Sequence, residues 1–286
     1  MRYGALLAFV GLWSLIVYYP LAHMVWGAGG LLLNLGALDF AGGNVVHISS
    51  GVSGLVACIL LGRRKNYQNV LPHNIPFVLI GAALLLFGWI GFNAGSALTA
   101  SGLAAHALMT TVTSGAAAML SWMALESFTA KKPTALGAAT GVVVGLVAIT
   151  PAAGFVPVWA SIVIGLVVSP LCWLAISVLK KKLGYDDALD AFGCHGIGGI
   201  WGGIATGLFA TSAVNPAVTD QGLFFGGGLL GAQLIGICLT VALAGIGTFV
   251  IFKGISLVMK VRVDESSEVM GLDQTEHGET AYPTSA

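Results

Sequence analysis

Eight long apolar runs constrain the fold of this chain more than any other feature. A helix that spans a lipid bilayer needs about 20 mostly apolar residues. The runs that predict such helices lie at about 4–22, 42–62, 76–98, 103–125, 135–151, 158–179, 193–211 and 224–252. Pro20 is expected to break the first run, because proline disrupts a helix interior. We therefore predict an all-α polytopic membrane protein with eight transmembrane helices.

The scarcity of charge excludes the soluble classes of protein. Only 8% of the 286 residues are charged and 57% are hydrophobic, whereas a soluble domain has about 25% charged residues. So few charges cannot cover a surface that faces water, which excludes a nucleic-acid-binding protein, a soluble enzyme and a secreted disulfide scaffold. Many glycines instead indicate helices packed closely on one another, as at Gly137, Gly141 and Gly145, which share one helical face.

The positive charges give the orientation in the membrane. If the chain crosses eight times, all twelve Lys and Arg residues fall on one side: Arg2, Arg63, Arg64, Lys65, Lys131, Lys132, Lys180, Lys181, Lys182, Lys253, Lys260 and Arg262. The positive-inside rule makes that side cytoplasmic. A miscounted helix would scatter these charges over both sides. We predict a transmembrane domain over 1–262 and a polar cytoplasmic tail over 263–286, with both termini inside.

A repeated motif centres on two histidines. His47 begins the sequence HISSGVSG and His195 begins HGIGGIWG, so each is followed by glycine four and seven residues later. Their helices would run in opposite directions, which indicates an inverted repeat, a build typical of transporters with a site near the midplane. We expect the histidines to meet in one lumen, where two neutral imidazoles offer a donor and an acceptor. The alternative is two unrelated histidines, each bonded to a backbone carbonyl.

Aromatic residues are predicted to gather at the outer side of the membrane. Trp89, Phe92 and Ser96 are spaced three and four residues apart and so share one helical face. Aromatic faces attract ammonium-like cations, and Trp26 could add a second face; the alternative is ordinary packing. Asp39 precedes the second helix, where it either caps that helix or adds negative field, and the cap is favoured.

These residues together resemble the ammonium transporter family (Amt/Mep/Rh), on its Amt side. The resemblance covers essentially the whole chain and is carried, in order, by PLAHMVWGAGG, DFAGGNVVH, PHNIPFVLIGAALLLFGWIGFNAGSA, AITPAAG, DDALDAFGCHGIGGIWG and GLDQTEHGETAY. It implies an inverted-repeat fold of eleven helices assembled as a homotrimer, with one pore in each protomer. The eight predicted helices align with the last eight of the family. We therefore expect the transmembrane domain to be N-terminally incomplete, lacking the first three helices.

The resemblance also implies roles for the residues singled out above. An external ammonium-recruitment site would contain Trp26, Phe92 and Ser96, and Phe92 would be half of an aromatic gate. The two histidines would form a twin-histidine pore, with Trp89 lining it, and Asp39 would belong to the external site. The tail segment GLDQTEHGETAY is similar to the one on which PII-type signalling proteins dock in family members.

The leading prediction is thus an ammonium/ammonia transmembrane transporter of the cell membrane, active in nitrogen metabolism. It is not an enzyme, uses no cofactor or metal, and has no nucleic-acid partner. The alternative is an ammonium-sensing membrane receptor that signals through its tail, or a transport-inactive fragment. A metalloenzyme built on the two histidines is disfavoured because no carboxylate shares their membrane layer. Gas conduction of the Rh kind is disfavoured by the Amt-type tail.

Overall fold

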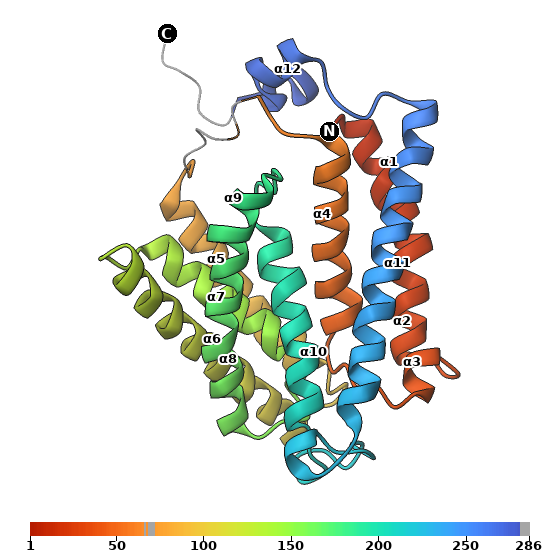
Figure 1. Cartoon of the computed structure of the whole chain (residues 1–286), viewed down its shortest axis with the longest axis vertical. Helices are drawn as coiled ribbons and strands as arrows, with labels where there is room; N and C mark the ends of the chain where they lie inside the picture. Colours follow the sequence, from red (N-terminus) through yellow and green to blue (C-terminus); the bar gives the residue numbers. More distant parts are fainter. Residues whose placement is uncertain (66, 68–71, 281–286) are drawn as a thin grey trace.

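The chain folds as a bundle of helices. A computed structural model describes residues 1–65, 67 and 72–280, and these contain helices and loops but no strand. The predicted all-α class is confirmed. The N-terminus and the short helix α12 lie at the same end of the bundle (Figure 1). The last six residues of the predicted tail, 281–286, lie outside the described residues.

Each of the eight predicted runs coincides with a helical unit of the described chain. The units are α1–η1–α2 (Tyr3–Trp13, Ser14–Tyr18, Tyr19–Trp26), η2–α4 (Gly43–Ile48, Ser49–Leu61), α5 (Ile75–Gly95), α6 (Gly102–Thr129), α7 (Ala135–Ile149), α8–η4–α9 (Val158–Leu174, Ala175–Leu179, Lys180–Leu183), η5–α10 (Phe192–Ile197, Gly198–Phe209) and α11 (Leu229–Val258). Shorter helices are α3 (Leu31–Asn34), η6 (Leu223–Phe225), α12 (Glu265–Met270) and η7 (Asp273–His277).

The number of membrane crossings stays a prediction. Within the described residues, six helices are long and apolar enough to cross a membrane: Tyr3–Asn34, Gly43–Leu61, Ile75–Gly95, Gly102–Thr129, Val158–Leu183 and Leu229–Val258. Helix α7 is a shorter apolar helix, and the η5–α10 unit is not among the six. The domain limit at residue 262 and the cytoplasmic position of both termini depend on the same count, and they too remain predictions.

The predicted break at Pro20 is wrong. The first helix continues through this residue to Trp26, and Pro20 is the second residue of α2. The five residues before α2, Ser14–Tyr18, form a π-helical turn. Such a turn is wider than an α-helical one. It therefore leaves room for the proline ring and for the carbonyl group that Pro20 cannot bond.

The largest part of the core lies where α6, α7 and α8 pack together. A Cβ on Gly141 would lie 2.8 Å from the Cα of Met119, and one on Gly145 would lie 2.6 Å from the carbonyl oxygen of Ser114. The predicted close contact of the glycine face is thus confirmed for these two positions, because backbone meets backbone. The third glycine of that face, Gly137, meets a side chain instead.

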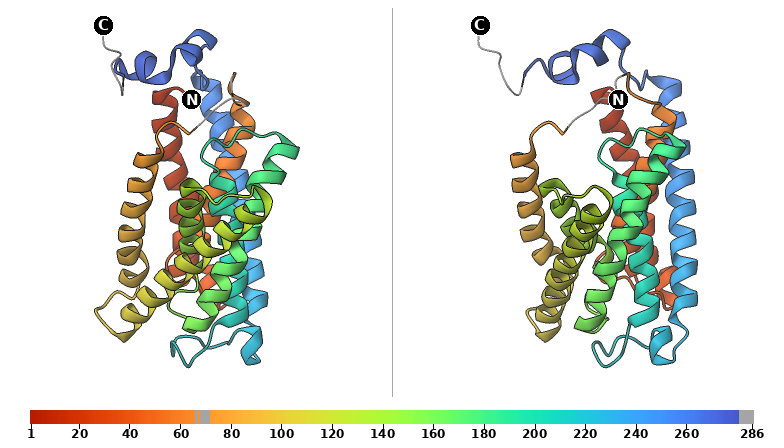
Figure 2. Two further views of the ribbon diagram at one scale, coloured as in Figure 1. Left: turned by 90° about the vertical axis from the view of Figure 1, so that its left-hand side faces the viewer. Right: turned by 60° about the vertical axis from the view of Figure 1, so that its left-hand side comes forward.

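Helices α4 and α10 run in opposite directions beside each other in the centre of the bundle. Helix α4 ends near α12, whereas α10 ends at the opposite end of the molecule (Figure 1). This is the arrangement that an inverted repeat requires. Helices α5 and α6 stand to one side of this central pair, and α11 stands on the other side (Figure 2). Residues of η2, α4, α5 and η5 line one pocket beside this central pair.

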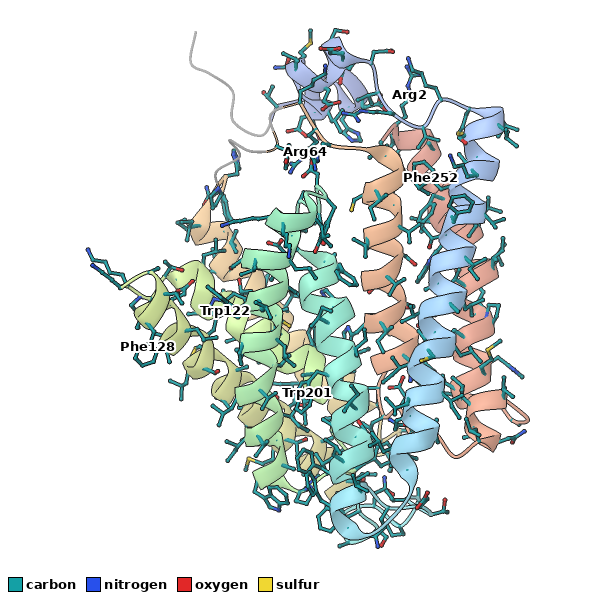
Figure 3. The ribbon with its side chains drawn as sticks, in the orientation of Figure 1. Arg2, Arg64, Trp122, Phe128, Trp201 and Phe252 are labelled. Atoms are coloured by element: carbon teal, nitrogen blue, oxygen red, sulfur yellow. The ribbon has the colours of Figure 1, made fainter. Side chains whose placement is uncertain are left out.

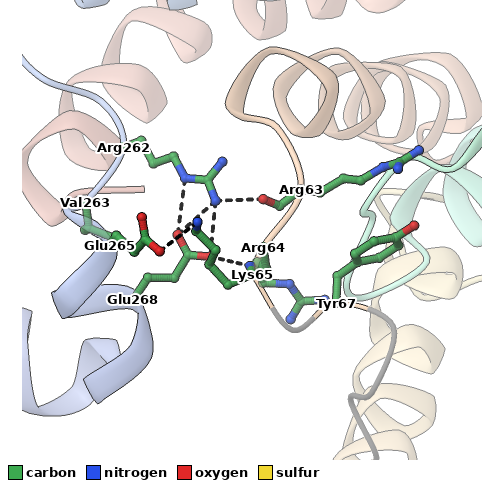
Figure 4. Close-up of a pocket in the computed structure, with 8 residues that line it drawn as sticks. All are labelled: Arg63, Arg64, Lys65, Tyr67, Arg262, Val263, Glu265 and Glu268. Carbon is green, nitrogen blue, oxygen red and sulfur yellow. Dashed lines mark hydrogen bonds and ion pairs between the residues drawn. The ribbon is translucent and has the colours of Figure 1, made fainter.

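The segment after α11 folds back over the end of the bundle that carries the N-terminus (Figure 3). Arg262 donates hydrogen bonds to the carbonyl oxygens of Leu61 and Arg63 at 3.0 and 2.6 Å, and pairs with Glu268 at 2.9 Å. Glu268 also accepts the backbone N–H of Lys65 at 2.8 Å. These contacts surround a pocket of about 470 Å³ (Figure 4). The tail is thus attached to the end of α4.

A second contact joins the same loop to the segment that leads into η5. The Arg64 guanidinium donates to both carboxylate oxygens of Asp186, at 2.7 and 2.8 Å. This charge-assisted pair lowers the pKa of the Asp186 carboxyl. The chain that follows α4 and the chain that precedes η5 are therefore linked at one end of the molecule.

Candidate functional site

The two predicted histidines meet. The Nδ1 atoms of His47 and His195 are 3.1 Å apart, and their ring centroids are 5.2 Å apart. His47 is only 2% exposed, and its Nε2 has no hydrogen-bond partner among the described residues. At this distance one Nδ1 carries a hydrogen and the other accepts it. The alternative of two unrelated histidines, each bonded to a carbonyl, is not what the described residues show.

Both histidines lie in π-helical turns. His47 is the fifth of the six residues of η2, and His195 is the fourth of the six residues of η5. In η2 the backbone N–H of His47 donates to the carbonyl of Gly42, five residues earlier. π-helical turns are rare in proteins as a whole, and those that occur often lie at functional sites. Each half of the repeat therefore presents its histidine from the same unusual local structure.

An aromatic wall stands against His47. The Trp89 ring stacks on the imidazole with centroids 5.3 Å apart and an interplanar angle of 17°. Phe92 meets Trp89 edge to face at 5.8 Å and lies 6.3 Å from His47. Trp89 Nε1 donates to the Thr150 hydroxyl at 2.9 Å, and Thr150 is within 3.4 Å of the Asn93 amide oxygen. This buried chain of polar groups fixes the plane of the indole ring.

The histidines and the aromatic wall line one cavity of about 360 Å³. Its lining residues come from η2, α4, α5 and η5: Val46, His47, Ser50, Leu84, Leu85, Gly88, Trp89, Phe92 and His195. The lining is mostly carbon, with the imidazoles and the Ser50 hydroxyl as its polar groups. Leu84 and Leu85 are 66% and 52% exposed, so the α5 side of the cavity opens onto the surface of the chain.

Two predicted residues of the outer site lie outside this lining. Trp26 donates from Nε1 to the carbonyl oxygen of Asp39 at 2.7 Å, and its ring is 43% exposed. The Ser96 hydroxyl donates to the carbonyl oxygen of Phe92, four residues earlier, at 2.9 Å. Of the three residues predicted for cation recruitment, the structure therefore brings only Phe92 to the histidines.

Asp39 makes the contacts of a helix cap. Its carboxylate accepts the backbone N–H groups of Gly42, Gly43 and Asn44, at 2.8, 2.6 and 2.7 Å. Burial raises the pKa of this carboxyl, and the three hydrogen bonds oppose the rise. Since these donors belong to the start of η2, the carboxylate orients the turn that carries His47.

One polar residue near the site was missed by the sequence reasoning. Gln233 of α11 is fully buried, accepts the backbone N–H of Leu38 at 2.7 Å and donates to its carbonyl oxygen at 2.9 Å. It also donates to the carbonyl of Gly203 in α10 at 3.2 Å. The signal that could have revealed it is a lone amide inside an apolar run, because such a group needs partners. Gln233 holds the loop that contains Asp39 against two helices.

Known proteins resemble this chain over its length. Residues 1–282 match the Ammonium Transporter Family. An ammonium transporter of Bacillus subtilis is 56% identical over 286 residues, which cover 100% of this chain and 70% of that protein. An ammonium transporter of Aquifex aeolicus is 47% identical over 283 residues, covering 99% of this chain and 66% of that protein.

Solved structures share the fold. The crystal structure of Saccharomyces cerevisiae Mep2 has a TM-score of 0.83 and 40% sequence identity, covering 87% of this chain and 58% of that one. A structure titled Sensor Amt Protein has a TM-score of 0.82 and 29% identity, covering 91% of this chain and 67% of that one. The relatives are thus longer than this chain, and the match extends over nearly all of it. On sequence and on structure, the chain belongs to the ammonium transporter family.

Proposed function

We propose that this chain conducts ammonia across a membrane, past the pair formed by His47 and His195, after ammonium has been recruited at an outer aromatic site. The observation that carries the proposal is the 3.1 Å contact between the two imidazoles in a cavity that is otherwise mostly carbon. Membership of the ammonium transporter family supports the choice of substrate.

The chemistry of the cavity favours a neutral substrate in the lumen. A bare ammonium ion in an apolar site is strongly destabilised unless a counter-charge neutralises it. The lining residues carry no carboxylate. Ammonium would therefore release a proton to water as it enters and cross as ammonia, which both donates and accepts hydrogen bonds. We assign the partnerless Nε2 of His47 as a group that meets it.

The recruitment site is proposed for Trp26, Phe92 and Ser96. The exposed indole face of Trp26 and the ring of Phe92 can attract a cation through their π systems. The Ser96 hydroxyl donates to a carbonyl oxygen, which leaves its own oxygen lone pairs free to accept from an ammonium N–H. Trp89 would line the pore below this site, and Asp39 would support it through the backbone.

We further propose the assembly and location that the family resemblance implies. The chain would act as a homotrimer in the cell membrane, with both ends in the cytoplasm. The placement of all twelve Lys and Arg residues supports this orientation. The tail would be the docking point of a PII-type regulator.

A flux assay tests the proposal. The full chain is reconstituted in liposomes and the uptake of labelled methylammonium is followed. Liposomes with the wild-type chain should take up more methylammonium than empty liposomes. His47→Ala and His195→Ala should each lower this uptake by at least about tenfold, which corresponds to about 1.4 kcal/mol in the barrier. The control is His106→Ala, since His106 lies outside the cavity and contacts the carbonyl of Val156 at 2.8 Å. A folded wild-type chain without uptake would contradict transport.

A second candidate is an ammonium-sensing membrane receptor. The likeness to the structure titled Sensor Amt Protein favours it, as does the attachment of the tail to the loop that follows α4. Ammonium binding without flux, measured on the same liposomes, would select this candidate over transport.

A further inference from the structure

We infer that Gly51 and Gly199 are positioning residues, each of which seats the histidine-bearing turn of the other half of the repeat and so sets the separation of the two imidazoles. This inference rests on the proposed function for its flux readout only. Both glycines are four residues after a histidine.

Gly51 faces the turn that carries His195. A Cβ on Gly51 would lie 2.2 Å from the nitrogen and 2.5 Å from the Cα of Gly196, and 3.0 Å from the carbonyl carbon of His195. All three are backbone atoms, which cannot move aside as the end of a flexible side chain can. A methyl group at this position therefore has to push α4 and η5 apart.

Gly199 faces the turn that carries His47. A Cβ on Gly199 would lie 3.0 Å from the Cβ of His47, 3.1 Å from the backbone nitrogen of Ile48 and 2.9 Å from the Cγ1 of Ile48. The contact is thus the reciprocal of the one at Gly51. In each helix, the glycine four residues after the histidine leaves space for the π-helical turn that carries the other histidine.

The glycines seven residues after the histidines do not face the pair. A Cβ on Gly54 would lie 3.6 Å from the Cβ of Ala191, which is an ordinary contact. A Cβ on Gly202 would clash, but against the carbonyl oxygen of Ala148 in α7, at 2.4 Å. Of the glycines at these two repeated positions, only the one four residues after each histidine therefore limits the approach of the two histidine turns.

The histidine contact is sensitive to this spacing. The two Nδ1 atoms are 3.1 Å apart, and a hydrogen bond weakens strongly beyond about 3.5 Å. Moving the turns apart by a few tenths of an ångström or more would break the contact without removing either imidazole. Gly51 and Gly199 thus act on the pair through the backbone.

The test uses the full chain with histidines labelled with ¹⁵N, in lipid. The variants are Gly51→Ala and Gly199→Ala; the controls are Gly54→Ala, which has room for a methyl group, and Gly202→Ala, which clashes with α7. The first readout is the NMR coupling across the Nδ1–H···Nδ1 bond. The second is methylammonium uptake. We expect the coupling to be lost in Gly51→Ala and Gly199→Ala, with uptake reduced at least about tenfold, since an ångström of misplacement can cost about a hundredfold in rate.

The controls separate positioning from general damage. Gly202→Ala is expected to unfold at a lower temperature while keeping the imidazole coupling, and Gly54→Ala is expected to match wild type in both. The inference is overturned if wild type has no coupling, if both Gly51→Ala and Gly199→Ala retain it, or if Gly202→Ala loses it equally. Should Gly51→Ala fail to fold, Gly199→Ala decides, because its shortest contact, 2.9 Å to the Cγ1 of Ile48, is milder than the 2.2 Å backbone contact at Gly51.

The same experiment keeps the two proposals apart. A wild-type chain that shows the coupling, loses it in the two variants and transports nothing would refute the proposed function and leave the positioning role standing. If the wild-type chain transports, and both variants keep its uptake and coupling, the positioning role is refuted and the proposed function stands.

Discussion

At Asp39, one carboxylate accepts three backbone N–H groups of the turn that leads into His47. Replacement by alanine leaves these donors buried without an acceptor. We expect Asp39→Ala to lower the free energy of unfolding by on the order of 3 kcal/mol. Asp39→Asn keeps one acceptor oxygen, so its free energy of unfolding should lie between those of Asp39→Ala and wild type. Denaturant unfolding in detergent measures this effect.

The control for this prediction is Asp220→Ala. Asp220 accepts one backbone N–H, that of Gly228, at 2.8 Å at an exposed position. Its removal should change the free energy of unfolding by less than about 1 kcal/mol. Equal unfolding curves for Asp39→Ala and wild type would show that the cap does not hold the η2 turn.

The sequence predicted the meeting of His47 and His195 because both histidines begin the same glycine-spaced motif in helices of opposite direction. It also placed Trp89 and Phe92 on one face, and they do lie together. It could not place Trp26, whose indole N–H bonds a carbonyl in a loop thirteen residues away. Helical spacing describes neighbours within one helix and carries no information about such tertiary contacts.

At the scale of the helix, glycine faces decide where helices can touch. A Cβ on Gly145 would lie 2.6 Å from the carbonyl oxygen of Ser114 in α6, whereas a Cβ on Gly81 in α5 would meet nothing within 4 Å. We expect Gly145→Ala to destabilise the chain by about 1–3 kcal/mol through overpacking. Gly81→Ala should instead stabilise it by up to about 1 kcal/mol, because alanine favours a helix.

The opposite signs make this pair of variants informative. Thermal unfolding of both in the same detergent gives the comparison. If Gly145→Ala were as stable as Gly81→Ala, the close packing of α6 on α7 would be disproved.

The eight apolar runs predicted the helical units well, since length and hydropathy determine them. The π-helical turns could not be predicted in this way. A pattern of period 3.6 assumes a regular helix, and the extra residue in η2 or η5 has no characteristic residue type. The continuation of the first helix through Pro20 follows from the same local structure, and this is why the expectation of a break was wrong.

At the scale of the whole molecule, the pair of Arg64 and Asp186 joins the chain after α4 to the chain before η5. Because Arg64 lowers the pKa of Asp186 in the folded state, the pair stabilises the fold above the unfolded pKa of about 3.9. This stabilisation is lost as the pH falls through the lower, folded pKa. Asp186→Asn should therefore unfold roughly 2–4 °C below wild type at neutral pH.

The pH dependence identifies the cause. The difference between Asp186→Asn and wild type should shrink as the pH is lowered through the acidic range, as thermal unfolding between neutral and acidic pH would show. Glu265→Gln removes an exposed ion pair with Lys65 and should differ little from wild type at neutral pH. A difference for Asp186→Asn that stays constant over the whole range would exclude the ion pair as its origin.

The inverted repeat brings two equivalent residues together, yet the bond between them cannot be symmetric. A single hydrogen lies between the two Nδ1 atoms. At any instant one ring carries its hydrogen at Nδ1 and the other carries it at Nε2. Were a proton to enter at the Nε2 of the ring that carries its hydrogen at Nδ1, and leave from the Nε2 of the other ring, both rings would exchange tautomers. The tautomers of the two rings would then depend on the direction in which the last proton passed. A second proton could follow in the same direction only after both rings had returned to their original tautomers.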